Sequence, residues 1–219
     1  MTLDDIISLL NESFRNAHVV DDEPVDRRLI QDWIMLQRNV FIKNYINEKG
    51  TIEQNVLQFE LLTLSAFDTS LSLGGASLGK YVLRSGICPK MIEGRSGMAV
   101  YELTSADILS RTIQHVPFDR LRWAGNGKTN RDMLYAGFYD DGFYVKSGSE
   151  ITKPISKLRV VGGFADPTLV STYTRATDDY PVNEYIIAYM NNMVKKEDFS
   201  FTASQPADRS NDSSGEIKQ

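Results

Sequence analysis

The chain has 219 residues, of which 42% are hydrophobic and 24% are charged, values typical of a soluble globular protein. Its net charge of −5 argues against a protein that holds nucleic acid mainly by nonspecific charge, although a local basic face stays possible. The single cysteine, Cys88, excludes an intrachain disulfide and a cysteine-rich metal site.

The first helix is predicted from the N-terminus onward. Thr2 and Asp5 have the spacing of a capping box. The apolar residues that follow recur at helical spacing: Leu3, Ile6, Ile7, Leu10 and Phe14. An acidic loop then leads to Asp26, which can cap a second helix.

A long amphipathic helix is predicted over residues 26–47, ending near Gly50. Large side chains recur at three- and four-residue steps: Leu29, Ile30, Trp33, Ile34, Gln37, Val40, Phe41, Asn44 and Tyr45. We place the basic residues on its other face: Arg27, Arg28, Arg38, Lys43 and Lys49. That face is expected to be solvated, with contact to an acidic partner or to DNA phosphate as the alternative.

From about residue 54 the hydrophobic period changes to that of β-strands. Strands are predicted over residues 56–66, 80–84 and 155–164, and hairpins over 91–103 and 133–145. The second hairpin turns at Asp140 and Asp141, a good tight-turn pair. Residues 105–116 are ambiguous because Leu109 and Ile113 also fit a helical turn. Short strands with close turns indicate an antiparallel sandwich or barrel.

The C-terminal region combines a helix with a polar tail. Pro181 is expected to open the helix, whose apolar stripe comprises Val182, Tyr185, Ile186, Tyr189, Met190, Met193 and Val194. Residues 203–219 contain only Ile217 as a large apolar residue, too little to offset the entropy cost of ordering this segment. We therefore expect an extended tail that becomes ordered on docking, with Phe199 and Phe201 as apolar anchors.

The predicted fold class is thus α+β, in four parts. Residues 1–50 form N-terminal helices and residues 51–168 a β-sandwich-like domain. Residues 169–202 contain a C-terminal helix that packs on the helical part, and residues 203–219 form the docking tail.

The sequence contains no convincing catalytic, cofactor or metal site. Residues 74–81 come close to a phosphate-binding loop, but Tyr81 stands where Ser or Thr would bind magnesium, and a strand is expected next. His18 and His115 are far apart, and Cys88 has no histidine near it in sequence. Trp123 beside Arg122 is a weak signal for nucleic-acid stacking.

Targeting and membrane signals are also missing from the sequence. Asp4 and Asp5 occupy the region where a secretory signal carries basic residues. No apolar run approaches the roughly 18 residues of a membrane-spanning helix. We expect no membrane contact, and assembly in a reducing cytoplasm.

Several segments, taken in order, resemble one family. They are residues 3–7, 25–30, 58–61, 80–83, 138–145 and 158–167, then Tyr180-Pro181, Pro206-Ala207-Asp208 and Asn211-Asp212. This order resembles the ring (neck or tail-adaptor) structural protein of crAss-like and related short-tailed bacteriophages.

The resemblance implies a non-enzymatic virion protein that needs no cofactor. Such proteins resemble a helical part joined to a β-sandwich, and assemble, commonly as twelve copies, beneath the portal protein and around the channel for double-stranded DNA. The implied partners are further copies of itself, the portal and neighbouring tail or ring proteins, with DNA passing without specific binding. The implied location is the neck or tail of a virion assembled in the bacterial cytoplasm.

The docking residues follow from the resemblance together with the tail's composition. C-terminal segments of such proteins commonly dock on the portal, which makes the candidates Phe199, Phe201, Pro206, Asp208, Asn211 and Asp212. A competing interpretation is a host β-sandwich module that binds a peptide or a polysaccharide.

Overall fold

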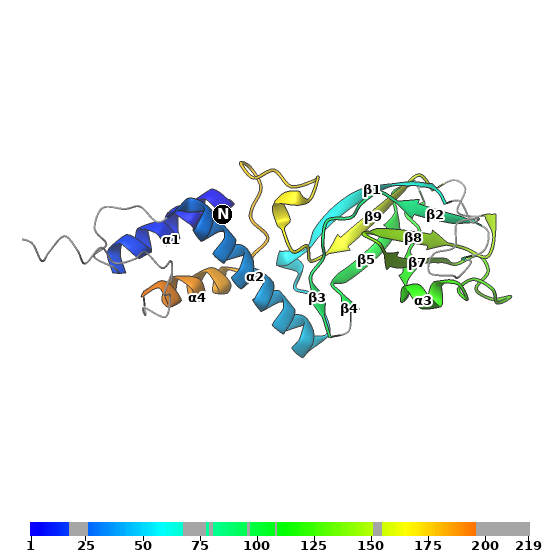
Figure 1. The fold of residues 1–219 in the computed structure, drawn as a ribbon, viewed down its shortest axis with the longest axis horizontal. Helices are drawn as coiled ribbons and strands as arrows, with labels where there is room; N and C mark the ends of the chain where they lie inside the picture. The colour runs from blue at the N-terminus through cyan, green and yellow to red at the C-terminus, as the bar shows by residue number, and fades with distance from the viewer. Residues whose placement is uncertain are drawn as a thin grey trace, which may run out of the picture.

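The computed structural model describes residues 1–17, 26–67, 78, 81–95, 97–107, 109–150 and 155–195. They form an elongated molecule, with helices at one end and a β-barrel at the other (Figure 1). The long helix α2 lies between the two parts, and its C-terminal end reaches the small strands β3 and β4.

Three helices make up the helical bundle: α1 (Leu3–Ala17), α2 (Arg27–Lys49) and α4 (Glu184–Lys195). The predicted capping box is confirmed, because Thr2 N donates to Asp5 Oδ2 at 3.0 Å and Asp5 N donates to Thr2 Oγ1 at 3.3 Å. Helix α2 also has its predicted limits, with Asp26 as the N-cap and Gly50 in the left-handed conformation at the C-cap.

The core of the bundle joins the two ends of the sequence. α1 and α4 pack against each other and against α2, where the Phe41 ring contacts the rings of Tyr185 and Tyr189 of α4. The buried residues shared by these helices and the segment before α4 are Leu3, Ile6, Ile7, Leu10, Phe14, Ile30, Ile34, Tyr180, Ile186, Ile187, Met190 and Val194. Helix α4 begins at Glu184, three residues later than expected, because Pro181 belongs to the extended segment that precedes it.

Seven strands form the barrel: β1 (Gln58–Ala66), β2 (Val82–Ser85), β5 (Val100–Ser105), β6 (Ile113–His115), β7 (Leu134–Tyr139), β8 (Gly142–Lys146) and β9 (Lys157–Gly162). They follow the order β5-β9-β1-β2-β8-β7-β6. The two edge strands approach each other, because Thr104 and Thr112 form an isolated bridge and Ser105 N donates to Arg111 O at 2.9 Å. The sheet is therefore a nearly closed barrel.

The expectation of a wholly antiparallel sheet is wrong at one strand. β6 runs parallel to β7, with Ile113 opposite Leu134. This strand lies in the ambiguous region 105–116, where the helical alternative fails. Pairing with β7 satisfies the backbone groups there, a long-range contact that local spacing does not reveal. A four-residue helix, α3 (Phe118–Leu121), was not predicted.

The two predicted hairpins are confirmed. β7 and β8 turn at Asp140 (φ 49°) and Asp141 (φ 57°), and positive φ at both positions suits the right-handed twist of the strands. β3 (Glu93–Gly94) and β4 (Gly97–Met98) form the smaller hairpin, and the chain then joins the barrel as β5. The strand expected from residue 56 begins at Gln58, after the short helix η1 (Gln54–Val56).

Helix α2 also contributes to the barrel side. Ile42 and Ile46, in its C-terminal half, pack with Ile52, Val56, Ile92 and Ala99. A separate cluster of 15 buried residues, among them Phe143, Val160 and Phe164, fills the barrel itself. One helix therefore supplies apolar residues to both ends of the molecule.

Candidate functional site: a groove between the barrel and the helical bundle

Arg38 lies where the barrel meets the bundle. The sequence analysis placed it on an exposed basic face, and that prediction is wrong, because the side chain is fully buried. The buried residues of α2 are Ile30, Ile34, Arg38, Ile42 and Ile46, each four residues from the next. At about 100° per residue, each step of four advances this row by about 40° around the helix. Arg38 therefore stands at the point where the buried side passes from the bundle to the barrel.

The guanidinium of Arg38 ties three segments together. Its Nε donates to Pro181 O at 2.6 Å and its Nη1 to Phe164 O at 2.8 Å. The neighbouring Asn39 Nδ2 donates to Ala165 O at 2.8 Å. The end of the barrel and the start of α4 are thus both held on α2. Burial lowers the pKa of Arg38 to about 10, so the side chain stays charged at neutral pH.

Tyr180 covers the buried charge from the other side. The Arg38 Cζ atom lies 5.8 Å from the centroid of the Tyr180 ring, within the range of a cation–π contact. Burial raises the pKa of Tyr180 to about 12, so the ring remains neutral beside the guanidinium. The ring thus faces the guanidinium without adding an anion.

We call residues 163–183, between β9 and α4, the connector. On the barrel side, Ser171 N and Ser171 Oγ both donate to the Glu60 carboxylate at 2.6 Å. Thr172 Oγ1 donates to Phe59 O at 2.5 Å. Near α4, Asn183 Nδ2 donates to Glu53 Oε2 at 2.9 Å. These bonds fix the connector along the outside of the barrel.

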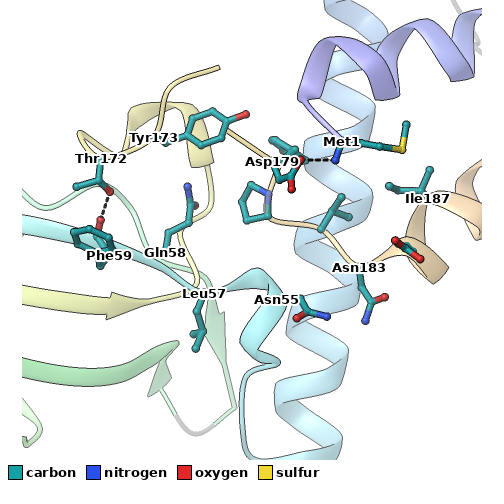
Figure 2. A pocket seen from close by; sticks show the side chains of 14 residues that line it. Met1, Asn55, Leu57, Gln58, Phe59, Thr172, Tyr173, Asp179, Asn183 and Ile187 are labelled. Carbon is teal, nitrogen blue, oxygen red and sulfur yellow. Dashed lines mark hydrogen bonds and ion pairs between the residues drawn. The ribbon is translucent and has the colours of Figure 1, made fainter. Parts of the chain in front are cut away.

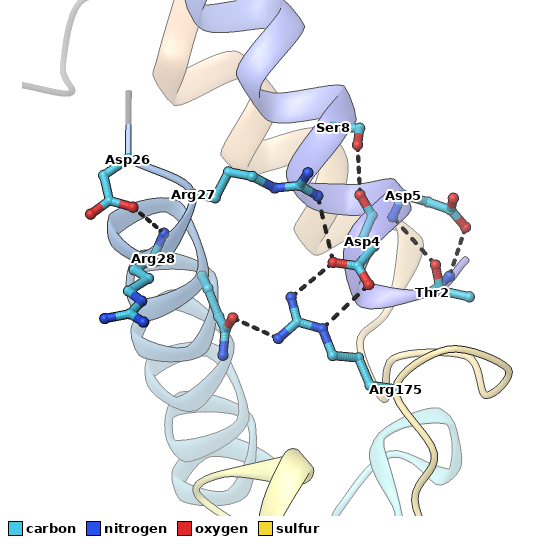
Figure 3. Close-up of polar contacts among 9 residues, drawn as sticks. Thr2, Asp4, Asp5, Ser8, Asp26, Arg27, Arg28 and Arg175 are labelled. Atoms are coloured by element: carbon cyan, nitrogen blue, oxygen red, sulfur yellow. Dashed lines mark hydrogen bonds and ion pairs between the residues drawn. The ribbon is translucent and has the colours of Figure 1, made fainter. Parts of the chain in front are cut away.

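An ion cluster fixes the connector to the bundle (Figure 3). Arg175 Nη2 and Nε donate to the two oxygens of Asp4 at 2.8 and 3.3 Å, and Nη1 donates to Gln31 Oε1 at 3.0 Å. Arg27 lies 3.6 Å from the same carboxylate. The hydrogen bond from Arg175 lowers the pKa of Asp4, and the same bond raises the pKa of Arg175.

A groove of about 570 Å³ opens between β1 and the connector (Figure 2). Its residues come from the N-terminus, from 55–59 and from the connector with the start of α4. Apolar groups of Phe59, Tyr173 and Ile187 share this lining with the carboxylates of Asp179 and Glu184, and Asp179 pairs with the N-terminal ammonium of Met1. Such an open, polar and partly apolar groove suits a macromolecular surface better than an enclosed small molecule.

The chain matches one protein family over nearly its whole length. Over residues 5–217, the chain matches the family described as phage tail ring protein 2. The chain belongs to this family. No curated protein matches the chain. The matched range includes the bundle, the barrel and the C-terminal segment.

Family membership gives the ring protein a structural role in a phage tail. It implies an oligomer that contacts other tail proteins, and a role that is not enzymatic. Helices within the described ranges are too short or too polar to cross a membrane. The family match confirms the resemblance to a phage ring protein that the sequence showed.

Among the described residues, the structure gives the environment of Cys88 and the position of His115. Cys88 is buried, and burial raises the pKa of its thiol to about 12, so the thiolate is scarce at neutral pH. His115 lies on β6, and His18 is outside the described residues. Of residues 74–80 only Leu78 is described, and strand β2 follows, as expected. Among the described residues, no group of three or more His, Cys, Asp or Glu could hold a metal ion.

Trp123 is 65% exposed, and the Arg122 Cζ atom lies 4.7 Å from its ring centroid. The pair sits in the turns after α3, and neither residue lines the groove. Asp140 and Asp141 form the turn between β7 and β8, as predicted.

The predicted docking residues lie outside the described residues: Phe199, Phe201, Pro206, Asp208, Asn211 and Asp212. They remain predictions. The residue that sequence reasoning missed is Arg38. The signal for it was its position midway between Ile34 and Ile42, in a row of isoleucines spaced by four.

Proposed function

We propose that this protein forms a homo-oligomeric ring, of twelve copies, in the head–tail connector of a phage, where it joins the portal to the tail. The match to a phage tail ring family over residues 5–217 carries this proposal. The shape is suited to it, since a bundle at one end and a barrel at the other offer separate surfaces to separate neighbours.

The proposed division of labour follows the parts of the chain. The helical part comprises residues 1–50 and 169–202, the β-domain residues 51–168, and the docking tail residues 203–219. The tail, with Phe199 and Phe201 as anchors and Pro206, Asp208, Asn211 and Asp212 as polar contacts, extends to the portal. A polar segment that orders only on binding can span the distance between two rings.

In this proposal double-stranded DNA passes through the lumen without specific binding. A chain with a net charge of −5 repels phosphate overall, which allows packaged DNA to slide. A gel-shift assay at physiological salt should therefore show no retardation of duplex DNA by the purified protein. Retardation that falls steeply with added salt would contradict this part of the proposal.

The test of the whole proposal is electron microscopy of the purified protein mixed with its portal. A ring seated on the portal is the expected result. A chain that lacks residues 203–219 should keep the thermal stability of the full chain but lose attachment to the portal. Attachment equal to that of the full chain would refute the role of the tail.

A further inference from the structure

Besides the groove, a strip of exposed apolar side chains on α2 has no partner within the described residues. Leu29 is 44% exposed, Leu36 58% and Val40 44%. Together with the exposed Lys43, they follow steps of seven, four and three residues and share one face of the helix. We call Leu29, Leu36, Val40 and Lys43 the α2 ridge.

The ridge and the groove point in opposite directions. Arg38 reaches Pro181, which lines the groove, so it marks the groove side of α2. Leu36 and Val40 lie two residues before and after Arg38, each about 200° around the helix from it. One surface of the molecule is therefore a projecting apolar row, and the surface across the helix from it is a hollow.

We propose that the ridge of one copy fits into the groove of the next copy in the ring. The proposal rests on the ring assembly proposed above and names the lateral contact within it. A ring requires a head-to-tail interface made from two different surfaces of each subunit, here placed on opposite sides of one helix. Repetition of the contact then continues in one direction around the ring.

The chemistry of the two surfaces is complementary. The groove offers Phe59, which is 39% exposed, as an apolar contact for Leu36 and Val40. The carboxylates of Asp179 and Glu184 lie in the same groove. Asp179 is paired with the N-terminal ammonium of Met1, and Glu184 is exposed. Lys43 at one end of the ridge would face Glu184. The acid Asp32 is eleven residues earlier, about 16 Å along the helix, which favours one orientation of the docked helix over its reverse.

Cysteine cross-linking in tails isolated from phage particles tests the contact. One chain carries Leu36→Cys on the ridge and Asn55→Cys, an exposed residue of the groove. Mild oxidation should produce a ladder of dimers, trimers and larger species on a non-reducing gel, because each copy links to the next. Each single variant should produce no ladder, and the natural Cys88 is buried and should not react.

A matched control pairs Asn55→Cys with Leu109→Cys, a leucine that is 72% exposed on a barrel loop, and should give no ladder. In parallel, Leu36→Asp should lower the number of rings in tails at least tenfold, with unchanged melting temperature of the free protein, whereas Leu109→Asp should not change it.

The outcomes separate the two proposals. Rings visible in the tails without a ladder from the Leu36→Cys and Asn55→Cys chain would overturn the ridge-and-groove contact, and the proposed place of the protein in the head–tail connector would stand. Particles that lack the protein altogether would overturn that proposed place itself.

Discussion

The helical bundle and the β-barrel are built from the chain in different ways. The barrel uses one continuous stretch, from β1 to β9, and most neighbouring strands exchange backbone hydrogen bonds. The bundle combines α1 and α2 with α4, which lies about 140 residues further along, and has no backbone ladder between its elements. The barrel thus depends mainly on pairing within itself, and the bundle on contacts between distant segments.

Polar bonds and an apolar cluster both hold the two parts in one arrangement. Arg38 and the connector supply the polar bonds, and Ile42 and Ile46 of α2 pack against the barrel side. A ring subunit transmits contacts from one neighbour to another, so a fixed angle between its parts matters for assembly. The variants below test that view, in order of decreasing expected effect.

Arg38→Ala should have the largest effect. It leaves the carbonyls of Phe164 and Pro181 without their donor and opens a cavity in the junction, at a cost of about 3–5 kcal/mol. Urea denaturation should show the lower stability, and a split into two transitions would indicate that the parts have been uncoupled. Arg28→Ala, on the exposed side of α2, is the control and should change stability by less than about 0.5 kcal/mol.

Glu60→Ala should rank second, because it removes the acceptor for both bonds from Ser171. The expected loss is about 2 kcal/mol, since hydrogen bonds to a charged group are the stronger ones. Glu102→Ala is the matched control on the same barrel, where a pair with Arg159 at 4.0 Å is half exposed and contributes less than about 1 kcal/mol. Equal losses in chemical denaturation would show that the connector bonds contribute nothing special.

Asp141→Gly should stabilise the protein through the turn between β7 and β8 of the barrel. Asp141 has φ 57°, a left-handed conformation that glycine adopts without the Cβ penalty, so we expect a gain of about 0.5–1 kcal/mol. Gly50→Ala, at φ 71° at the end of α2, should have the opposite sign and lose about 1 kcal/mol. Thermal melting measures both, and a destabilised Asp141→Gly protein would contradict the turn assignment.

Asp4→Asn should have the smallest effect, and its effect on the free energy of unfolding should depend on pH. The folded pKa of Asp4 lies below its unfolded value, so its contribution is fully present above about pH 4 and is lost as pH falls through the lowered pKa. Because the carboxylate is 46% exposed, screening limits the contribution to about 0.5 kcal/mol. Unfolding free energies of the native and variant proteins should differ at pH 7 and converge near pH 2.

Much of the local structure could be predicted from neighbouring residues. These signals act over a few residues and are therefore complete in the sequence: the capping box of Thr2 and Asp5, the two caps of α2, and the turn at Asp140 and Asp141. The parallel strand β6 could not be predicted, because its partner β7 lies beyond α3 and local spacing also allowed a helical turn. The groove could not be predicted either, since its walls come from three distant segments.

The sequence by itself determined the α+β class, the limits of α2, the main hairpins and, through resemblance, the ring family, because each depends on short-range periodicity or on a pattern along the chain. Only the tertiary structure decided that Arg38 is buried, that the barrel nearly closes, and that ridge and groove lie on opposite sides of α2. A charged residue on a helix has the same local pattern whether water or a second layer covers it. The covering segments at Phe164 and Pro181 are more than 120 residues away in the chain, and only folding brings them to the guanidinium.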